Sequence, residues 1–233
     1  DKDRSLIHAA RAVELAPLSS RSHAVLGLAY RDLQDLDKAL SEYNKAIELT
    51  PKAAGLYRER RHIHMRQGNR QLALADALKS TELAPDDEWS WLAVAEVYLT
   101  LGQYDNALIA SSRGLELAAP NRTTSFYHFE TRADILSRFK RYDEALADYS
   151  KAIELAPYRS HLYKRRADAY FRMENFDESL TDIEKAVDLK PDDLSALRWI
   201  GLNDVAQCPD EQFRAGLLKL ADKAIELTHH SAR

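Results

Sequence analysis

The chain has 233 residues, of which 45% are hydrophobic and 30% are charged, proportions that are normal for a soluble helical protein. Its 33 positive and 37 negative side chains give a formal charge of −4, so nothing in the composition attracts phosphate backbones or anionic membranes in general. The single cysteine, Cys208, excludes an internal disulfide framework and fits a reducing, cytoplasmic compartment, and no apolar run approaches the length of a membrane span.

One pattern recurs along the chain and sets its organisation. It is clearest in residues 142–157, where Ala145, Tyr149 and Ala152 fall on one face of a helix and Pro157 ends it. Close copies occupy 36–51 and 176–191, and looser copies occupy 2–17, 70–85, 104–120 and 214–229. The boundary prolines are 34 residues apart for much of the chain, which indicates a repeat array that grows by addition.

Each full unit is predicted to form two antiparallel helices joined by a short turn. The units are a half repeat over 1–19, full repeats over 20–53, 54–87, 88–121, 126–159 and 160–193, and a divergent sixth repeat over 194–233. Helices are expected over 2–15, 20–33, 36–49, 54–67, 70–83, 88–101, 104–117, 124–139, 142–155, 161–173, 176–189, 194–205 and 214–228. The period slips after Leu117, where 121–125 form a short polar insertion. Because the chain opens inside a second helix, we expect it to be an excised piece.

Residue size varies in step with the repeat. A large residue early in the first helix recurs as His23, Tyr57, Trp91, Phe129, Tyr163 and Leu197, and a small residue follows four positions later as Gly27, Ala95, Ala133, Ala167 and Gly201. The second helices carry small residues at two positions, such as Ala39 and Ala46, because closely packed helices tolerate little bulk where they cross. Arg61 departs from this pattern, which implies that the second unit is splayed or that the side chain extends outward to solvent.

These positions resemble those of tetratricopeptide repeats over nearly the whole chain. The resemblance implies an all-α fold, a right-handed α-α superhelix of antiparallel helix pairs. It also implies that the first helices line a concave groove that binds a partner. The groove residues that we expect to contact a partner are Arg58, His62, Arg66, Trp89, Glu96, Tyr127, Asp134, Lys164, Asp168, Phe171, Arg172 and Trp199.

A simpler interpretation of the charged groove residues is that they form exposed ion pairs worth about 0–1 kcal/mol each. In that case Arg58 or Arg66 would pair with Glu96, and Lys164 with Glu130 or Asp134. The family members that clamp a chaperone tail use lysine, asparagine and arginine at fixed positions, and the asparagines are missing here. We therefore predict no chaperone-tail clamp.

The sequence offers no pattern typical of catalysis. The glycines do not form a phosphate-binding loop, and His62 and His64 point to different faces of a helix, so they cannot bind one metal. We predict a chain that is not an enzyme and has no catalytic residue, metal or cofactor.

The predicted function is a non-enzymatic protein–protein interaction scaffold that binds a peptide or helix in its groove. Two alternatives stay open: a regulatory segment of a larger bacterial signalling enzyme such as a Ser/Thr kinase, and an RNA-binding helical repeat, against which the negative charge argues. No membrane partner is expected. Both terminal helices lack a polar cap, so further repeats or end-to-end self-association are expected.

Overall fold

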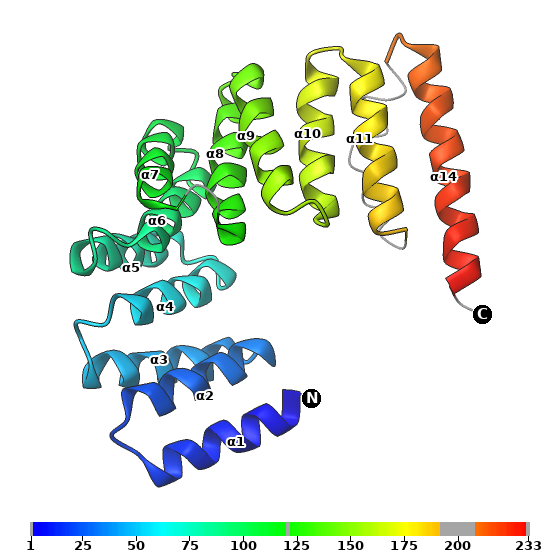
Figure 1. Cartoon of the computed structure of the whole chain (residues 1–233). Coiled ribbons are helices and arrows are strands. Elements are labelled where there is room, and N and C mark those ends of the chain that lie inside the picture. Colours follow the sequence, from blue (N-terminus) through cyan, green and yellow to red (C-terminus); the bar gives the residue numbers. More distant parts are fainter. Residues whose placement is uncertain (1, 120–121, 192–207, 232–233) are drawn as a thin grey trace. The chain divides into compact units, whose positions relative to one another are not determined.

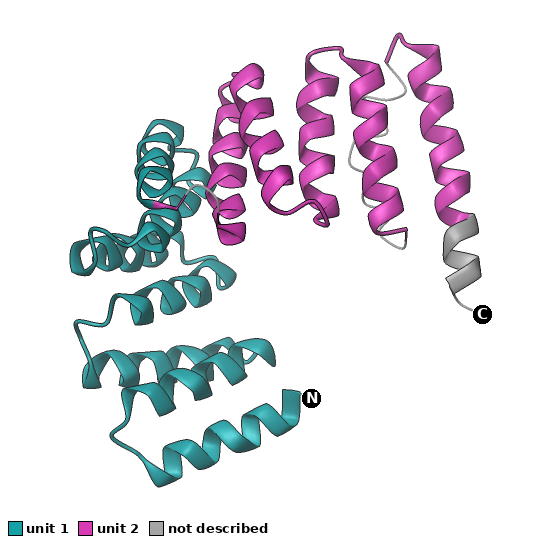
Figure 2. Cartoon of the chain, viewed as in Figure 1, with its two compact units in different colours: residues 1–117 teal, residues 118–233 magenta. Residues whose placement is uncertain are grey.

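The computed structural model describes residues 2–119, 122–191 and 208–231, and all the regular structure in these ranges is helical (Figure 1). The chain divides into two compact units, residues 1–117 and 118–233 (Figure 2). Each unit is a series of antiparallel helix pairs, so the predicted all-α repeat fold is confirmed.

Unit 1 begins with a second helix that has no described partner within its own repeat. Its helices are α1 (Lys2–Leu15), α2 (Ser20–Asp32), α3 (Leu36–Leu49), α4 (Ala54–Arg66), α5 (Arg70–Leu83), α6 (Glu88–Thr100) and α7 (Tyr104–Leu117). Unit 2 contains the 3-10 turn η1 (Thr123–Ser125), α8 (Phe126–Arg138), α9 (Tyr142–Leu155), α10 (Ser160–Arg172), α11 (Phe176–Leu189) and α14 (Glu211–Ser231). Each predicted helix in the described ranges is present, within three residues at each end. The helix predicted over 194–205 lies outside those ranges.

The small residues of the repeat lie where helices cross. Ala39, Ala73, Ala107 and Ala145 are completely buried. Gly27 shows why bulk is excluded, because a Cβ atom there would lie 3.0 Å from Cε2 of Tyr43. The predicted alternation of large and small side chains is therefore the packing that closes each hairpin.

The large residue early in the first helix has a second role. In four repeats its polar atom lies 2.8–3.1 Å from the carbonyl oxygen of the proline six residues earlier. The four pairs are His23 with Pro17, Tyr57 with Pro51, Trp91 with Pro85, and Tyr163 with Pro157. In these four repeats, one position thus fixes the inter-repeat turn, and three kinds of side chain (His, Tyr and Trp) fill it. Trp91 is only half-buried.

Each described hairpin turns through one residue in the left-handed region. These residues are Gln34 (φ 68°), Gly68 (φ 79°), Gly102 (φ 72°), Lys140 (φ 59°) and Glu174 (φ 61°). This conformation favours glycine, so at Gln34, Lys140 and Glu174 the hairpin holds the backbone in the left-handed region.

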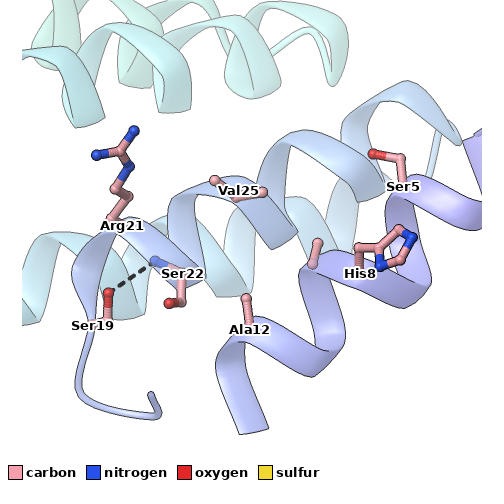
Figure 3. A pocket seen from close by; sticks show the side chains of 8 residues that line it. Ser5, His8, Ala12, Ser19, Arg21, Ser22 and Val25 are labelled. Atoms are coloured by element: carbon pink, nitrogen blue, oxygen red, sulfur yellow. Dashed lines mark hydrogen bonds between the residues drawn. The ribbon is translucent and has the colours of Figure 1, made fainter. Parts of the chain in front are cut away.

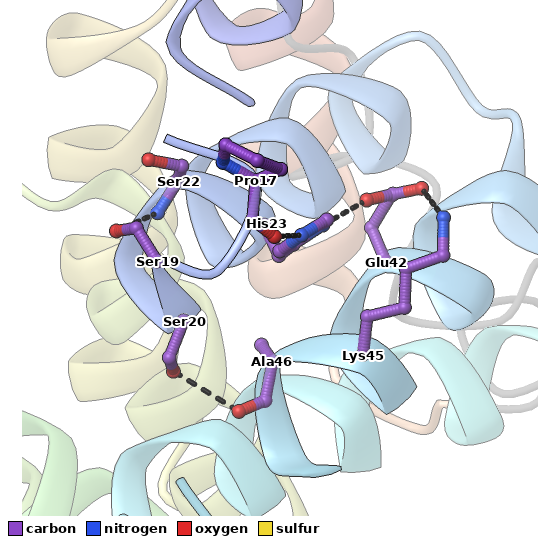
Figure 4. Close-up of polar contacts among 8 residues, drawn as sticks. All are labelled: Pro17, Ser19, Ser20, Ser22, His23, Glu42, Lys45 and Ala46. Atoms are coloured by element: carbon purple, nitrogen blue, oxygen red, sulfur yellow. Dashed lines mark hydrogen bonds and ion pairs between the residues drawn. The ribbon is translucent and has the colours of Figure 1, made fainter. Parts of the chain in front are cut away.

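An arginine of the first helix and an aspartate of the second join the hairpins internally. Bidentate pairs of this kind, with N–O distances of 2.6–2.8 Å, connect Arg60 with Asp76, Arg132 with Asp148, and Arg166 with Asp182. In the α2–α3 hairpin the acid is Glu42, whose carboxylate binds His23 and Lys45 instead (Figure 4). In the α6–α7 hairpin the same two positions hold the buried, apolar Val94 and Ala110.

Candidate functional site

The candidate surface of unit 1 is formed by the first helices α2, α4 and α6, and we call it the first-helix face of unit 1. The predicted stripe Arg58, His62 and Arg66 lies along α4. Arg58 forms an ion pair with Asp87 at the N-terminus of α6. Arg66 donates hydrogen bonds to the carbonyl oxygen of Arg31 (3.1 Å) and to the side-chain oxygen of Gln34. The expected pairing of Arg58 or Arg66 with Glu96 is therefore wrong, because each arginine reaches a nearer acceptor at its own end of α4.

The expectation for Arg61, the large residue in a small position, is also corrected. Its side chain does not extend outward to solvent and is only 5% exposed. Arg61 Nη1 lies 2.6 Å from Oε2 of Glu96 on α6, and this partner allows the cation to stay buried between two repeats. Arg61 Nε has no hydrogen-bond partner among the described residues.

His62 stays accessible to solvent on this face, although protein surrounds the ring on several sides. This desolvation, followed by the positive charges of Arg61, Arg31 and Arg58, lowers the pKa of His62 far below its ordinary value of 6.5. Arg61 Nη2 lies 2.8 Å from His62 Nε2, and because a guanidinium can only donate, the ring nitrogen accepts. His62 is therefore a neutral side chain in a positive field.

Two further predicted residues lie on α6. Trp89 is half-buried near the start of the helix, and the side chain of Glu96 keeps 40% exposure although it pairs with Arg61. The N-terminus of α6 is capped by Asp87, which accepts a hydrogen bond from the Ser90 amide at 3.0 Å.

In unit 2 the first-helix face is formed by α8 and α10. Asp134 accepts a hydrogen bond from the Tyr149 hydroxyl (2.6 Å) and pairs with Arg165 (2.8 Å), which also reaches Glu130 (3.3 Å). Burial raises the pKa of Asp134 despite the nearby positive charge of Arg165. Glu130 also lies 3.3 Å from His161. The carboxylates of Asp134 and Glu130 therefore connect α8 with α9 and α10.

The remaining predicted residues of unit 2 differ in exposure. Tyr127 is 39% exposed, Lys164 is half-buried, and Arg172 is exposed with its Nε 3.3 Å from Oδ1 of Asp168. Phe171 packs with Phe176 and Phe213 at ring-centroid distances of 5.7 and 5.4 Å, so its structural role is packing. Trp199 lies outside the described residues.

Sequence reasoning missed Arg31 as a contributor to the first-helix face of unit 1, and it missed the partners of Arg61 and Arg165. A spacing signal could have found these partners. First-helix residues 35 positions apart are neighbours, as in Arg61 with Glu96, Glu130 with Arg165, and Arg31 with Arg66. Scanning the first helices for opposite charges at that interval would have identified the pairs Arg61–Glu96 and Glu130–Arg165, whereas Arg66 donates to the backbone carbonyl of Arg31.

Metal-binding and membrane-spanning features are missing from the part of the chain that the structure describes. No three His, Cys, Asp or Glu side chains gather there in a group that could hold a metal ion. Over the same residues, no helix combines the length and the apolar character needed to cross a membrane.

Comparison with known proteins identifies the repeat. Models described as TPR repeat and tetratricopeptide repeat match residues 27–68, 90–121, 130–159 and 160–193. The Protein SGT1 homolog of Oryza sativa subsp. japonica is 34% identical over 85 residues, which cover 36% of this chain and 23% of that protein. The chain spans less than a quarter of the length of the curated relatives it matches.

Solved structures agree with the fold. YrrB, described as a TPR protein with an unusual peptide-binding site, superposes with a TM-score of 0.59 at 23% identity, covering 83% of this chain and 98% of YrrB. The TPR protein TTC0263 of Thermus thermophilus gives a TM-score of 0.66 at 18% identity, covering 86% of this chain and all of that one. The helix pairs, their 34-residue period and these matches together show that the chain belongs to the tetratricopeptide repeat family.

Proposed function

We propose that this chain is a non-enzymatic protein-interaction module that holds a peptide or helix of a partner protein on its first-helix faces. Tetratricopeptide repeat proteins are in general interaction scaffolds, and the neighbour YrrB is described as having a peptide-binding site. The single cysteine supports a cytoplasmic setting for this binding.

The observation that carries the proposal is the positive field on the first-helix face of unit 1. His62 is exposed there, and three arginines from α2 and α4 act on its pKa in the same direction. Arg66 is exposed beside it and is hydrogen-bonded only to neutral groups. Among the described residues no carboxylate lies within ion-pair distance of Arg66, so its charge is left for a partner.

The complementary partner is a segment that carries acidic side chains. A carboxylate placed between Arg66 and His62 would accept hydrogen bonds from the guanidinium and gain from the neighbouring cations. Trp89 on α6 offers apolar area for the same segment. The proposed contacts in unit 1 are Arg58, His62, Arg66, Trp89 and Glu96. Those in unit 2 are Tyr127, Asp134, Lys164, Asp168 and Arg172, and Trp199 is kept as a proposed contact from the sequence alone.

The test uses a set of fluorescent peptides of one length, graded in Asp and Glu content, with binding measured by anisotropy. We expect the acidic peptides to bind most tightly and Arg66→Glu to weaken them about tenfold or more, a change of ~1.4 kcal/mol. The matched control is Arg70→Glu, another exposed arginine at the start of the second helix α5, which should leave binding unchanged.

Two results would contradict this proposal. One is an affinity that does not depend on peptide charge, and the other is an equal loss of affinity in the Arg66→Glu and Arg70→Glu variants. A single-stranded RNA that binds more tightly than the acidic peptides, with a steep salt dependence, would favour the RNA-binding alternative.

A further inference from the structure

An aromatic residue early in the first helix is paired with a cation in two of the hairpins. In α4 the guanidinium carbon of Arg60 lies over the ring of Tyr57, 5.6 Å from its centroid. In α10 Arg166 lies over the ring of Tyr163 in the same way, at 5.9 Å. Each of these arginines is also held by the bidentate aspartate of its hairpin. The repeat therefore places a guanidinium beside the aromatic ring as a cation–π contact.

Trp91 occupies the aromatic position of the α6–α7 hairpin, but that hairpin supplies no cation. Val94 and Ala110, both buried, replace the arginine and the aspartate. Nε1 of Trp91 donates a hydrogen bond to the carbonyl oxygen of Pro85 at 2.8 Å, so the inter-repeat turn holds the indole in place. Among the described residues no cation lies over the Trp91 ring. Tryptophan is nevertheless the aromatic side chain that attracts cations most strongly.

A cavity of about 530 Å³ opens beside Trp91 along α7. Its lining consists of Trp91, Leu108, Ile109, Ser112, Arg113 and Glu116. Ile109 is 68% exposed, and in the other four helix pairs its position holds a smaller residue, namely Ser41, Ala75, Ala147 or Thr181. This position is exposed in all five pairs, so the exposure of Ile109 does not result from the place of α7 at the end of unit 1.

The cavity between α1 and α2 offers a comparison within the same unit (Figure 3). It measures about 460 Å³, and His8 and Arg21 line it together with serine, alanine and valine side chains. Its lining contains no carboxylate and no indole, phenol or phenyl ring. An aromatic face and an acid therefore meet in the cavity beside Trp91 but not in this one.

Acidic side chains make the cavity beside Trp91 suitable for a cation. Glu116 lies in the lining and pairs with Arg113 at 3.0 Å, but the two side chains are 65% and 44% exposed. Such an exposed pair contributes little, so Glu116 can exchange Arg113 for an incoming cation. Asp86, which follows the carbonyl group that Trp91 binds, is exposed and has no ion-pair partner among the described residues.

We propose that the cavity beside Trp91 is a docking site for an arginine side chain from a basic segment of a partner protein. The methylene stem of that arginine packs against Leu108 and Ile109, and its guanidinium lies over the Trp91 ring within reach of Glu116. The partner thus supplies from outside the cation that Arg60 and Arg166 supply within their own hairpins.

This site is distinct from the first-helix face of unit 1. Five of its six lining residues lie on the second helix α7, and its ligand has the opposite charge to the acidic segment proposed for the first-helix face. The arginine site therefore does not depend on the function proposed above.

The experiment is an NMR titration of the full ¹⁵N-labelled chain with the peptide acetyl-Gly-Gly-Arg-Gly-Gly-amide, because NMR detects the weak affinity of a single side chain. The chain has three tryptophans, and the loss of one indole N–H signal in Trp91→Tyr identifies the signal of Trp91. We expect a saturable shift of this signal. The matched peptide with citrulline, which has the shape of arginine without its charge, should bind about fivefold more weakly or less.

Variants of the chain locate the site. Glu116→Gln should weaken binding of the arginine peptide about threefold or more. The matched control is Glu154→Gln on α9, which removes an acid of the same 65% exposure from the Lys151–Glu154 pair and should change nothing. Val94→Arg with Ala110→Asp gives the α6–α7 hairpin the arginine–aspartate pair of its neighbours, so its internal guanidinium should abolish the shift. Arg66→Glu should leave the affinity for the arginine peptide unchanged, so the two proposals fail separately.

Several results would overturn the proposal. One is an unmoved Trp91 signal, and another is an equal affinity for the arginine and citrulline peptides. A third is an equal effect of Glu116→Gln and Glu154→Gln, and a fourth is binding that survives Val94→Arg with Ala110→Asp in a variant whose circular dichroism matches the parent. A Trp91 signal that moves when the free chain is diluted would also overturn it, in favour of an arginine from a second copy.

Discussion

The ion pair between Arg132 of α8 and Asp148 of α9 offers a direct test of how the hairpins are held. The two N–O distances are 2.6 and 2.7 Å, and the side chains of Arg132 and Asp148 are 29% and 8% exposed. Asp148→Ala removes both carboxylate oxygens that accept hydrogen bonds from Arg132, and it leaves the guanidinium charge of Arg132 unpaired in the hairpin. Breaking a fully buried pair in this way costs about 3–5 kcal/mol. Because Arg132 is partly exposed and can recruit water, we expect a loss of ~2–3 kcal/mol.

Another hairpin of the chain shows which double variant should restore the stability lost in Asp148→Ala. The α6–α7 hairpin carries Val94 and Ala110 at these two positions, so Arg132→Val with Asp148→Ala copies a pairing that the fold already contains. No charge is then left unpaired, and the double variant should lie within about 1 kcal/mol of the parent. Each single variant leaves one charge unpaired, so the four proteins form a cycle with a coupling energy of ~2 kcal/mol or more.

Urea unfolding followed by far-UV circular dichroism measures the four stabilities. Hydrogen exchange over residues 126–155 shows whether the loss stays in this hairpin, as expected when repeats contact mainly their neighbours. Arg113 and Glu116 form an exposed i,i+3 pair at 3.0 Å, and replacing both should cost less than about 0.5 kcal/mol. If Asp148→Ala costs no more than this control, or if the double variant costs the sum of the singles, the pair does not hold the hairpin as argued.

Three further perturbations test the packing and the polar network. Glu174→Gly should stabilise the chain by about 0.5–1 kcal/mol because the residue adopts φ 61°, whereas Gly102→Ala (φ 72°) should destabilise it by a similar amount; thermal melts measure both. Gly27→Leu should cost about 1–3 kcal/mol in urea unfolding because even a Cβ atom contacts Tyr43. Burial alone would raise the pKa of Glu42, but hydrogen bonds from a lysine and a histidine outweigh it and lower the pKa below 4.5. Its stabilising contribution is therefore complete above pH 4.5 and is lost as the pH falls through the folded pKa, so Glu42→Gln should lose less stability between pH 7 and about pH 3 than the parent.

The helices and their pairing could be predicted from the sequence because size and polarity repeat at a fixed interval. A boundary proline restricts the backbone and small residues mark the helix crossings, and several such positions agree within each repeat. The turns could be predicted where glycine marks them, at Gly68 and Gly102. Lys140 adopts the same left-handed conformation with no local signal, because the two helices on either side of it impose the turn.

The partners of charged side chains could not be predicted in the same way. A long flexible side chain has several acceptors within reach, and the choice depends on which neighbour lies nearest after the helices have packed. Glu96 was expected to form an ion pair with Arg58 or Arg66, but it pairs with Arg61. The Arg61 side chain is buried between α4 and α6, and a buried guanidinium needs an anion to neutralise it.

A departure from the repeat pattern inside the array is matched by a second one. Arg61 replaces a small residue and is neutralised by Glu96, and Glu42 replaces aspartate and is bound by His23 and Lys45. Arg66 lacks such compensation, because no carboxylate lies within ion-pair distance of it among the described residues. In the proposed binding mode this position is left to an acid of the partner, so Arg66→Glu should lower the affinity for acidic peptides without lowering stability.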